Sequence, residues 1–171
     1  MWSNPVYFGT DLFVTLLLLL SAIAAYRNWK LLNNVAWKDA GFWRVLTFGF
    51  LYLAADELFG MHEMVGRTIS WAGVPSPWHT EHWDDLVLAL YFPVAGVTVL
   101  CWRREVLRVK RLLHLFVVGL ALTALAMLLD NTLHSPNNEF RLAGTIEEIV
   151  ELAGAGIIAF AIRTYQVYPI K

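Results

Sequence analysis

The sequence predicts an all-α protein, a polytopic membrane helical bundle of five transmembrane helices with the N-terminus outside and the C-terminus cytoplasmic. Three observations predict it. The chain of 171 residues is 58% hydrophobic with a mean hydropathy of +0.53, whereas soluble domains have roughly 45–50% apolar residues. Several apolar segments are long enough to cross a bilayer. The basic residues also fall almost entirely on one side of these segments.

A helix needs about 20 mostly apolar residues to cross the hydrocarbon core. The segments of that kind lie at approximately 8–26, 42–65, 83–102, 112–133 and 144–163. Their connections are short, and no repeat or linker divides them, so we expect a single transmembrane domain over residues 1–171. No Lys or Arg precedes the first segment, unlike in a secretory signal peptide, and we expect this segment to be retained.

The orientation follows from the basic residues, because Lys and Arg accumulate on the cytoplasmic side of membrane proteins. Of the 13 Lys and Arg residues, only Arg67 and Arg141 fall on the outer side. The others are Arg27, Lys30, Lys38, Arg44, Arg103, Arg104, Arg108, Lys110, Arg111, Arg163 and Lys171. Tryptophans near both ends of the segments fit the aromatic belts of the two membrane interfaces.

The acidic residues show the opposite bias, since 11 of the 14 Asp and Glu residues fall in outer halves or outer loops. An ionisable group inside a membrane costs about 2.5–3.5 kcal/mol on insertion scales, so such groups face the bundle interior and pair, share protons or bind a cation. Asp56 follows Arg44 by 12 residues, and Glu151 precedes Arg163 by 12. Both carboxylates should therefore lie at one level, about 18 Å from the inner anchors.

Helical spacing places carboxylates and histidines on shared faces, as in the pairs His82 with Asp85 and Asp130 with His134. Oxygen and imidazole ligands suit iron, manganese or zinc, and four-helix bundles hold di-iron and di-manganese centres with such residues. The single Cys101 excludes a cysteine-based site. We therefore expect one divalent ion or a dinuclear centre. Its candidate ligands are Asp56, His62, Glu63, His82, Asp85, Asp130, His134, Glu148 and Glu151.

Simpler interpretations remain open for several of these residues. Asp56 and Glu147 are either ligands or partners that orient the histidines. Glu147 and Glu148 also follow Thr145, a candidate N-cap, and acidic residues in a first turn favour the helix dipole. The same dipole argument explains one of Asp84 and Asp85. No cap explains Asp56, whose remaining alternative is a structural hydrogen-bond network.

The stretch from Asp56 to Glu63 resembles a motif of small bacterial membrane proteins, which implies no particular role. The expected location is the bacterial inner (plasma) membrane. The chain lacks the histidine boxes of membrane desaturases and the repeated Glu-x-x-His of ferritin-type bundles.

Three functional hypotheses follow. The first is a metal-dependent membrane oxidoreductase or hydrolase that acts on a lipid or another hydrophobic small molecule, with ligands from the last four segments and a peripheral first helix. The second is a non-catalytic small subunit of a larger membrane complex, whose polar cluster is structural or handles protons. A cation channel, the third, needs a polar path that the apolar inner halves do not provide. The net charge of −1 gives no indication of a nucleic-acid partner.

Overall fold

The computed structural model describes residues 5–33, 37–75, 83–108, 110–133 and 141–165, and these residues are helical apart from short turns. The prediction of an all-α fold is confirmed for this part of the chain. Of the described helices, one, spanning Gly9–Asn33, is both long and apolar enough to cross a membrane. The helices are α1 (Pro5–Asn33), α2 (Trp37–Phe59), α3 (Met61–Trp71), α4 (Trp83–Ala89), α5 (Tyr91–Cys101), α6 (Arg103–Arg108), α7 (Lys110–Leu133) and α8 (Arg141–Thr164).

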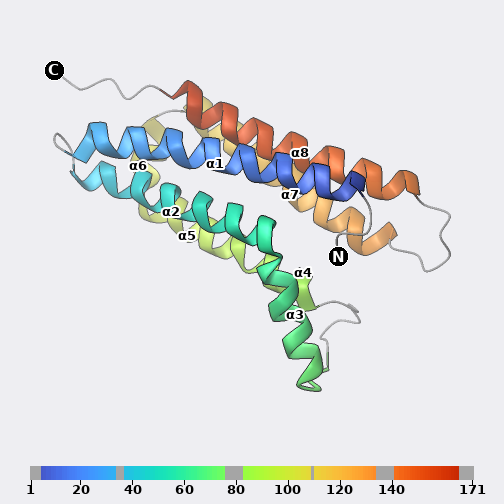
Figure 1. Ribbon diagram of the computed structural model, residues 1–171. Helices are drawn as coiled ribbons and strands as arrows, with labels where there is room; N and C mark the ends of the chain where they lie inside the picture. The colour runs from blue at the N-terminus through green and yellow to red at the C-terminus, as the bar shows by residue number, and fades with distance from the viewer. Residues whose placement is uncertain (1–4, 34–36, 76–82, 109, 134–140, 166–171) are drawn as a thin grey trace.

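The long helices lie side by side along one axis, while α3 diverges from that axis at one end and packs on α4 (Figure 1). The two largest helix pairs are α1 with α2 and α7 with α8, and α1 also packs on α8. The expectation of a peripheral first helix is therefore wrong. α1 is the element that joins the two pairs, which brings its N-terminal end next to the site described below.

Small residues are buried on both α1 and α2, the most extensively packed pair of helices. Ala22 and Ala25 of α1 and Ala40 and Ala54 of α2 are at most 2% exposed. Small side chains let two helix backbones approach closely, so dispersion contacts accumulate along the whole interface. At the end of the bundle away from α3, Trp43 is fully buried among apolar residues. The apolar core thus occupies one end of the bundle and leaves the other to polar side chains.

The segment expected as one helix over 42–65 is two helices, because the chain turns at Gly60. This glycine has φ 60° and ψ 44°, a left-handed conformation that costs other residues roughly 1–2 kcal/mol. Its N–H still bonds to the carbonyl of Asp56 at 2.7 Å, and α3 starts at the next residue. Asp56 and Glu63 consequently lie on different helices, instead of two turns apart on one.

The segment expected as one helix over 83–102 is interrupted at Leu90, between α4 and α5. Pro93 explains the position of this interruption. Proline has no N–H, and inside a helix its ring clashes with the carbonyl four residues earlier, which here belongs to Ala89. The interruption puts Tyr91 at the first position of α5, where it reaches α2.

Candidate functional site

The centre of the candidate site is the pair Asp56 and His62. Asp56 is only 3% exposed. Its Oδ1 accepts a hydrogen bond from the backbone N–H of His62 at 2.8 Å, and its Oδ2 lies 3.0 Å from His62 Nδ1. The N–H of His62 belongs to the first turn of α3 and has no partner within the helix. The turn at Gly60 therefore lets one buried carboxylate hold both the start of α3 and the imidazole.

The orientation of His62 follows from this contact. A nitrogen that faces a carboxylate carries the ring proton, so Nδ1 donates to Asp56 and Nε2 is the nitrogen left for another partner. The side chain of His62 is 17% exposed. This is the arrangement by which proteins fix the tautomer of a metal-binding or proton-transferring histidine.

A chain of hydroxyl groups continues from Asp56 towards the surface. Tyr91 donates to Asp56 Oδ2 at 3.1 Å, and the hydroxyls of Tyr91 and Tyr52 are also 3.1 Å apart. The two tyrosine rings pack edge to face, with centroids 5.8 Å apart. Tyr52 is 49% exposed. Hydrogen bonds therefore connect the imidazole of His62, through a buried carboxylate, to an exposed phenol.

Further carboxylates lie near Asp56. Glu57 interacts electrostatically with Glu151, Asp11, Asp56 and Glu63, and Asp11 interacts in the same way with Glu148 and Glu63. Like charges at this proximity are tolerated when they share protons or a cation. We name this group the acidic cluster, and it consists of Asp11, Asp56, Glu57, Glu63, Glu148 and Glu151.

Two polar contacts help to position the cluster. Thr10 donates its hydroxyl to Glu148 Oε2 at 2.6 Å, which ties α1 to α8. Arg67 donates to Glu63 Oε2 at 2.5 Å within α3. Four helices, α1, α2, α3 and α8, thus contribute carboxylates. Glu148 makes a contact between helices, so its place in the sequence is not explained by the helix dipole alone.

Four of the nine expected ligands, Asp56, Glu63, Glu148 and Glu151, belong to this cluster, and a fifth, His62, is bonded to its Asp56. Asp56 is the hydrogen-bond partner of His62, one of the two roles considered for it. His82 and His134 lie outside the described residues. Asp85, Asp130 and Glu147 fall within α4, α7 and α8, but their side chains also lie outside the described part.

Among the described residues, no group of three or more His, Cys, Asp or Glu side chains is close enough together to hold a metal ion. The five candidate ligands of this region therefore do not form a preformed metal centre within the part of the chain that the structure describes. Long Glu side chains reach a common centre only by changing rotamer, and the electrostatic repulsion between them opposes this unless a cation compensates.

Sequence reasoning missed Thr10, Asp11 and the two tyrosines. Residue counting, applied more widely, finds one of them: Tyr91 precedes Arg103 by 12 residues, the same interval that separates Arg44 from Asp56. This count places the phenol and the carboxylate at one depth. The contact of Asp11 with the cluster depends on the central position of α1, for which the sequence carries no comparable signal.

Comparison with known proteins identifies a family without assigning a role. No curated protein matches the chain, and no solved structure does. A family model described as a domain of unknown function (DUF8692) matches residues 1–166. With nearly its whole length matched, the chain belongs to this DUF8692 family.

Proposed function

We propose that the protein is an integral membrane protein of five spans: α1, α2, the pair α4 and α5, α7 and α8. The exposure pattern of α1 supports this. Its long apolar side chains Leu16, Leu20 and Ile23 are about half exposed, at 49%, 55% and 51%, whereas the polar Ser21 and Asn28 are buried. A soluble helix shows the reverse pattern. A lipid environment accounts for apolar side chains outside and small or polar ones inside.

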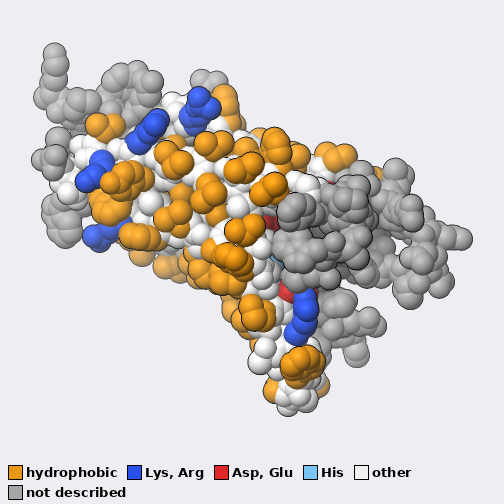
Figure 2. Space-filling model, viewed as in Figure 1, with side chains coloured by type: hydrophobic (Ala, Val, Ile, Leu, Met, Phe, Trp, Pro, Cys, Tyr) orange, Lys and Arg blue, Asp and Glu red, His pale blue; other side chains and the backbone are white. Residues whose placement is uncertain are grey.

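The surface supports the same proposal. Hydrophobic side chains cover the middle of the bundle, and Lys and Arg gather at the end away from α3 (Figure 2). α2, α7 and α8 have 23, 24 and 24 residues, long enough to cross the hydrocarbon core. Acidic residues lower the hydropathy of α2 and α8, and four of them, Asp56, Glu57, Glu148 and Glu151, belong to the acidic cluster.

We propose further that the acidic cluster binds a divalent metal, iron, manganese or zinc, with Nε2 of His62 as one ligand. The contact between Asp56 and His62 carries this proposal, because ligating histidines almost always donate their second ring N–H to a carboxylate, carbonyl or water. Glu57, Glu63 and Glu151 supply oxygen ligands. A metal held there would polarise a carbonyl or activate water or oxygen, which suits a membrane hydrolase or oxidoreductase with a hydrophobic substrate.

The second candidate function is proton handling by a non-catalytic subunit of a membrane complex. The series His62, Asp56, Tyr91 and Tyr52 favours it. Each of these side chains can accept or donate a proton, and each is within hydrogen-bond distance of the next. Shared protons would also reduce the repulsion within the acidic cluster.

Metal titration of the metal-stripped, detergent-purified protein separates these candidates. We expect stoichiometric binding of at least one of iron, manganese and zinc to the wild type. His62→Ala should weaken binding by at least about tenfold, because it removes an imidazole ligand. The matched control is His114→Ala, an exposed histidine of α7, which should bind like the wild type. A folded wild-type protein that binds none of the three metals contradicts the metal proposal and leaves proton handling.

A further inference from the structure

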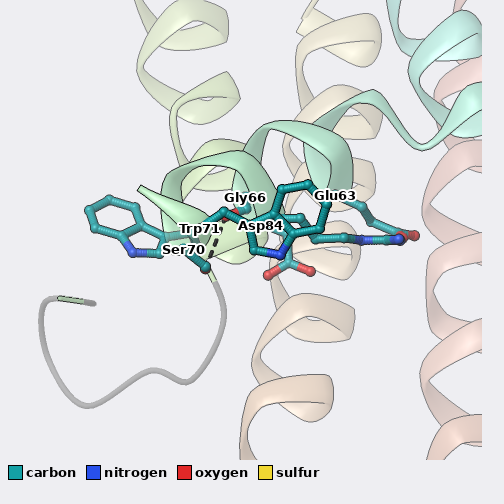
Figure 3. A pocket seen from close by; sticks show the side chains of 7 residues that line it. Glu63, Gly66, Ser70, Trp71 and Asp84 are labelled. Carbon is teal, nitrogen blue, oxygen red and sulfur yellow. Dashed lines mark hydrogen bonds and ion pairs between the residues drawn. The ribbon is translucent and has the colours of Figure 1, made fainter. Parts of the chain in front are cut away.

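A surface pocket of about 280 Å³ lies between α3 and the start of α4 (Figure 3). Glu63, Arg67, Ser70 and Trp71 of α3 line it at successive spacings of four, three and one residues, so they lie on one side of the helix. The acidic cluster reaches the pocket through Glu63, which belongs to both. The pocket and the candidate metal site are therefore neighbours.

The two walls approach each other closely at Gly66. A Cβ at this position would lie 2.5 Å from the backbone nitrogen of Asp84, so only glycine permits the observed approach of α3 to α4. Ser70 donates to the carbonyl of Gly66 at 3.0 Å, the dashed line in Figure 3. Trp83 donates its indole N–H to the carbonyl of Val74 at 3.1 Å, which fixes the opposite wall.

The pocket combines opposite charges with aromatic rings. Arg67 supplies the positive charge of the pocket, and its side chain is 60% exposed. Arginine is suited to phosphate because its planar group offers two parallel N–H donors. The carboxylates of Glu63 and Asp84 suit an ammonium group, which also binds favourably over an indole ring. Trp71 and Trp83 supply the indoles.

The exposure of Trp71 indicates where the pocket lies in the membrane. This side chain is 88% exposed at the end of α3, and tryptophan is enriched at the level of the lipid headgroups. In the proposed orientation the pocket faces the outer leaflet. The pocket thus lies at the level of the lipid headgroups, while the apolar faces of the bundle lie at the level of the acyl chains.

We propose that this pocket binds a zwitterionic lipid headgroup, with the phosphate on Arg67 and the ammonium group between the carboxylates and the indoles. The inference rests on the proposed membrane function and deepens it, because it makes a zwitterionic phospholipid the hydrophobic ligand presented to the acidic cluster. Glu63 links the two, since it contacts Arg67 and interacts with Glu57 and Asp11.

Native mass spectrometry of the purified full chain tests this, with phosphatidylethanolamine and phosphatidylglycerol of identical acyl chains as probes. We expect a preference of about tenfold for phosphatidylethanolamine, and its loss in Asp84→Asn, because this variant removes a carboxylate of the pocket that attracts the ammonium group. Arg67→Gln should weaken the binding of both lipids, because both carry the phosphate that the guanidinium binds. Arg67 forms an exposed ion pair, which contributes little to stability, so this variant should fold. Arg103→Gln removes an exposed arginine at the other end and should retain the preference.

Three further results decide the proposal. Displacement of the lipid by excess free O-phosphoethanolamine supports a headgroup pocket, and the concentration needed shows how much the acyl chains contribute. His62→Ala should retain the lipid preference even if metal binding is lost or absent. This result shows that lipid binding by the pocket does not depend on the metal proposal. Equal binding of the two lipids by the wild type, an unchanged preference in Asp84→Asn, or unchanged binding of both lipids in Arg67→Gln overturns it.

Discussion

Replacement of Asp56 by alanine should lower the free energy of unfolding by about 3 kcal/mol, because three hydrogen bonds to one buried carboxylate disappear and their donors stay partly buried. The donors are the backbone N–H and Nδ1 of His62 and the hydroxyl of Tyr91. Loss of the group that orients the imidazole should also weaken metal binding about 10- to 100-fold. Thermal unfolding in detergent and metal titration measure the two effects.

A graded series separates the role of Asp56 from general loss of polarity. Tyr91→Phe removes one of the three bonds and should cost about 1 kcal/mol. Tyr52→Phe removes only the bond between the two tyrosines, at an exposed position, and should cost less. Metal binding should follow the same order. Equal metal affinity in Asp56→Ala and the wild type would contradict the proposed orienting role.

Replacement of Gly154 by alanine should destabilise the contact between α7 and α8. A Cβ there would lie 2.9 Å from Thr123 Oγ1 and 3.0 Å from the carbonyl oxygen of Gly119. The second atom belongs to the backbone, so relief requires the two helices to move apart, at a cost of about 1–3 kcal/mol. A lower unfolding midpoint in detergent is the expected measurement.

Gly156 is the matched control, because it lies two residues away on the same helix and a Cβ there would meet nothing within 4 Å. Gly156→Ala should be neutral or should stabilise the protein by up to about 1 kcal/mol, since alanine favours the helix. If both variants unfold at the same midpoint, the close approach of α7 and α8 at Gly154 contributes nothing to stability.

Hydropathy and the helical period were sufficient to predict an all-α chain and to locate its long helices. The interruptions were harder to predict, although their causes are visible in the sequence. Gly60 interrupts a helix here, whereas Gly49 and Gly96 continue theirs, and glycine alone does not distinguish the two outcomes. Pro93 is a stronger signal, because the missing N–H disturbs a helix wherever it stands in the interior.

The candidate site was predictable only where residue counting fixes depth. The interval of 12 residues from the basic anchors placed Asp56 and Glu151 at one level, and Glu57, next to Asp56, does interact with Glu151. The pairing of Asp56 with His62 depends on the left-handed turn at Gly60 between them. The sequence predicted one continuous helix through both residues, without this turn. The contribution of Asp11 and Thr10 depends on which helices are neighbours, a property of packing and not of sequence period.

The central claim is a bundle of five spans with the acidic cluster on the outer side, and cysteine labelling tests it most directly. In a Cys101→Ser background, Val74→Cys reports the connection after α3, and Thr164→Cys reports the end of α8. A membrane-impermeant maleimide applied to intact cells should modify the first and not the second, while both should react after permeabilisation. Modification of both positions, or of neither, in intact cells would place them on one side, as expected if α1 alone crosses the membrane, and would contradict the account.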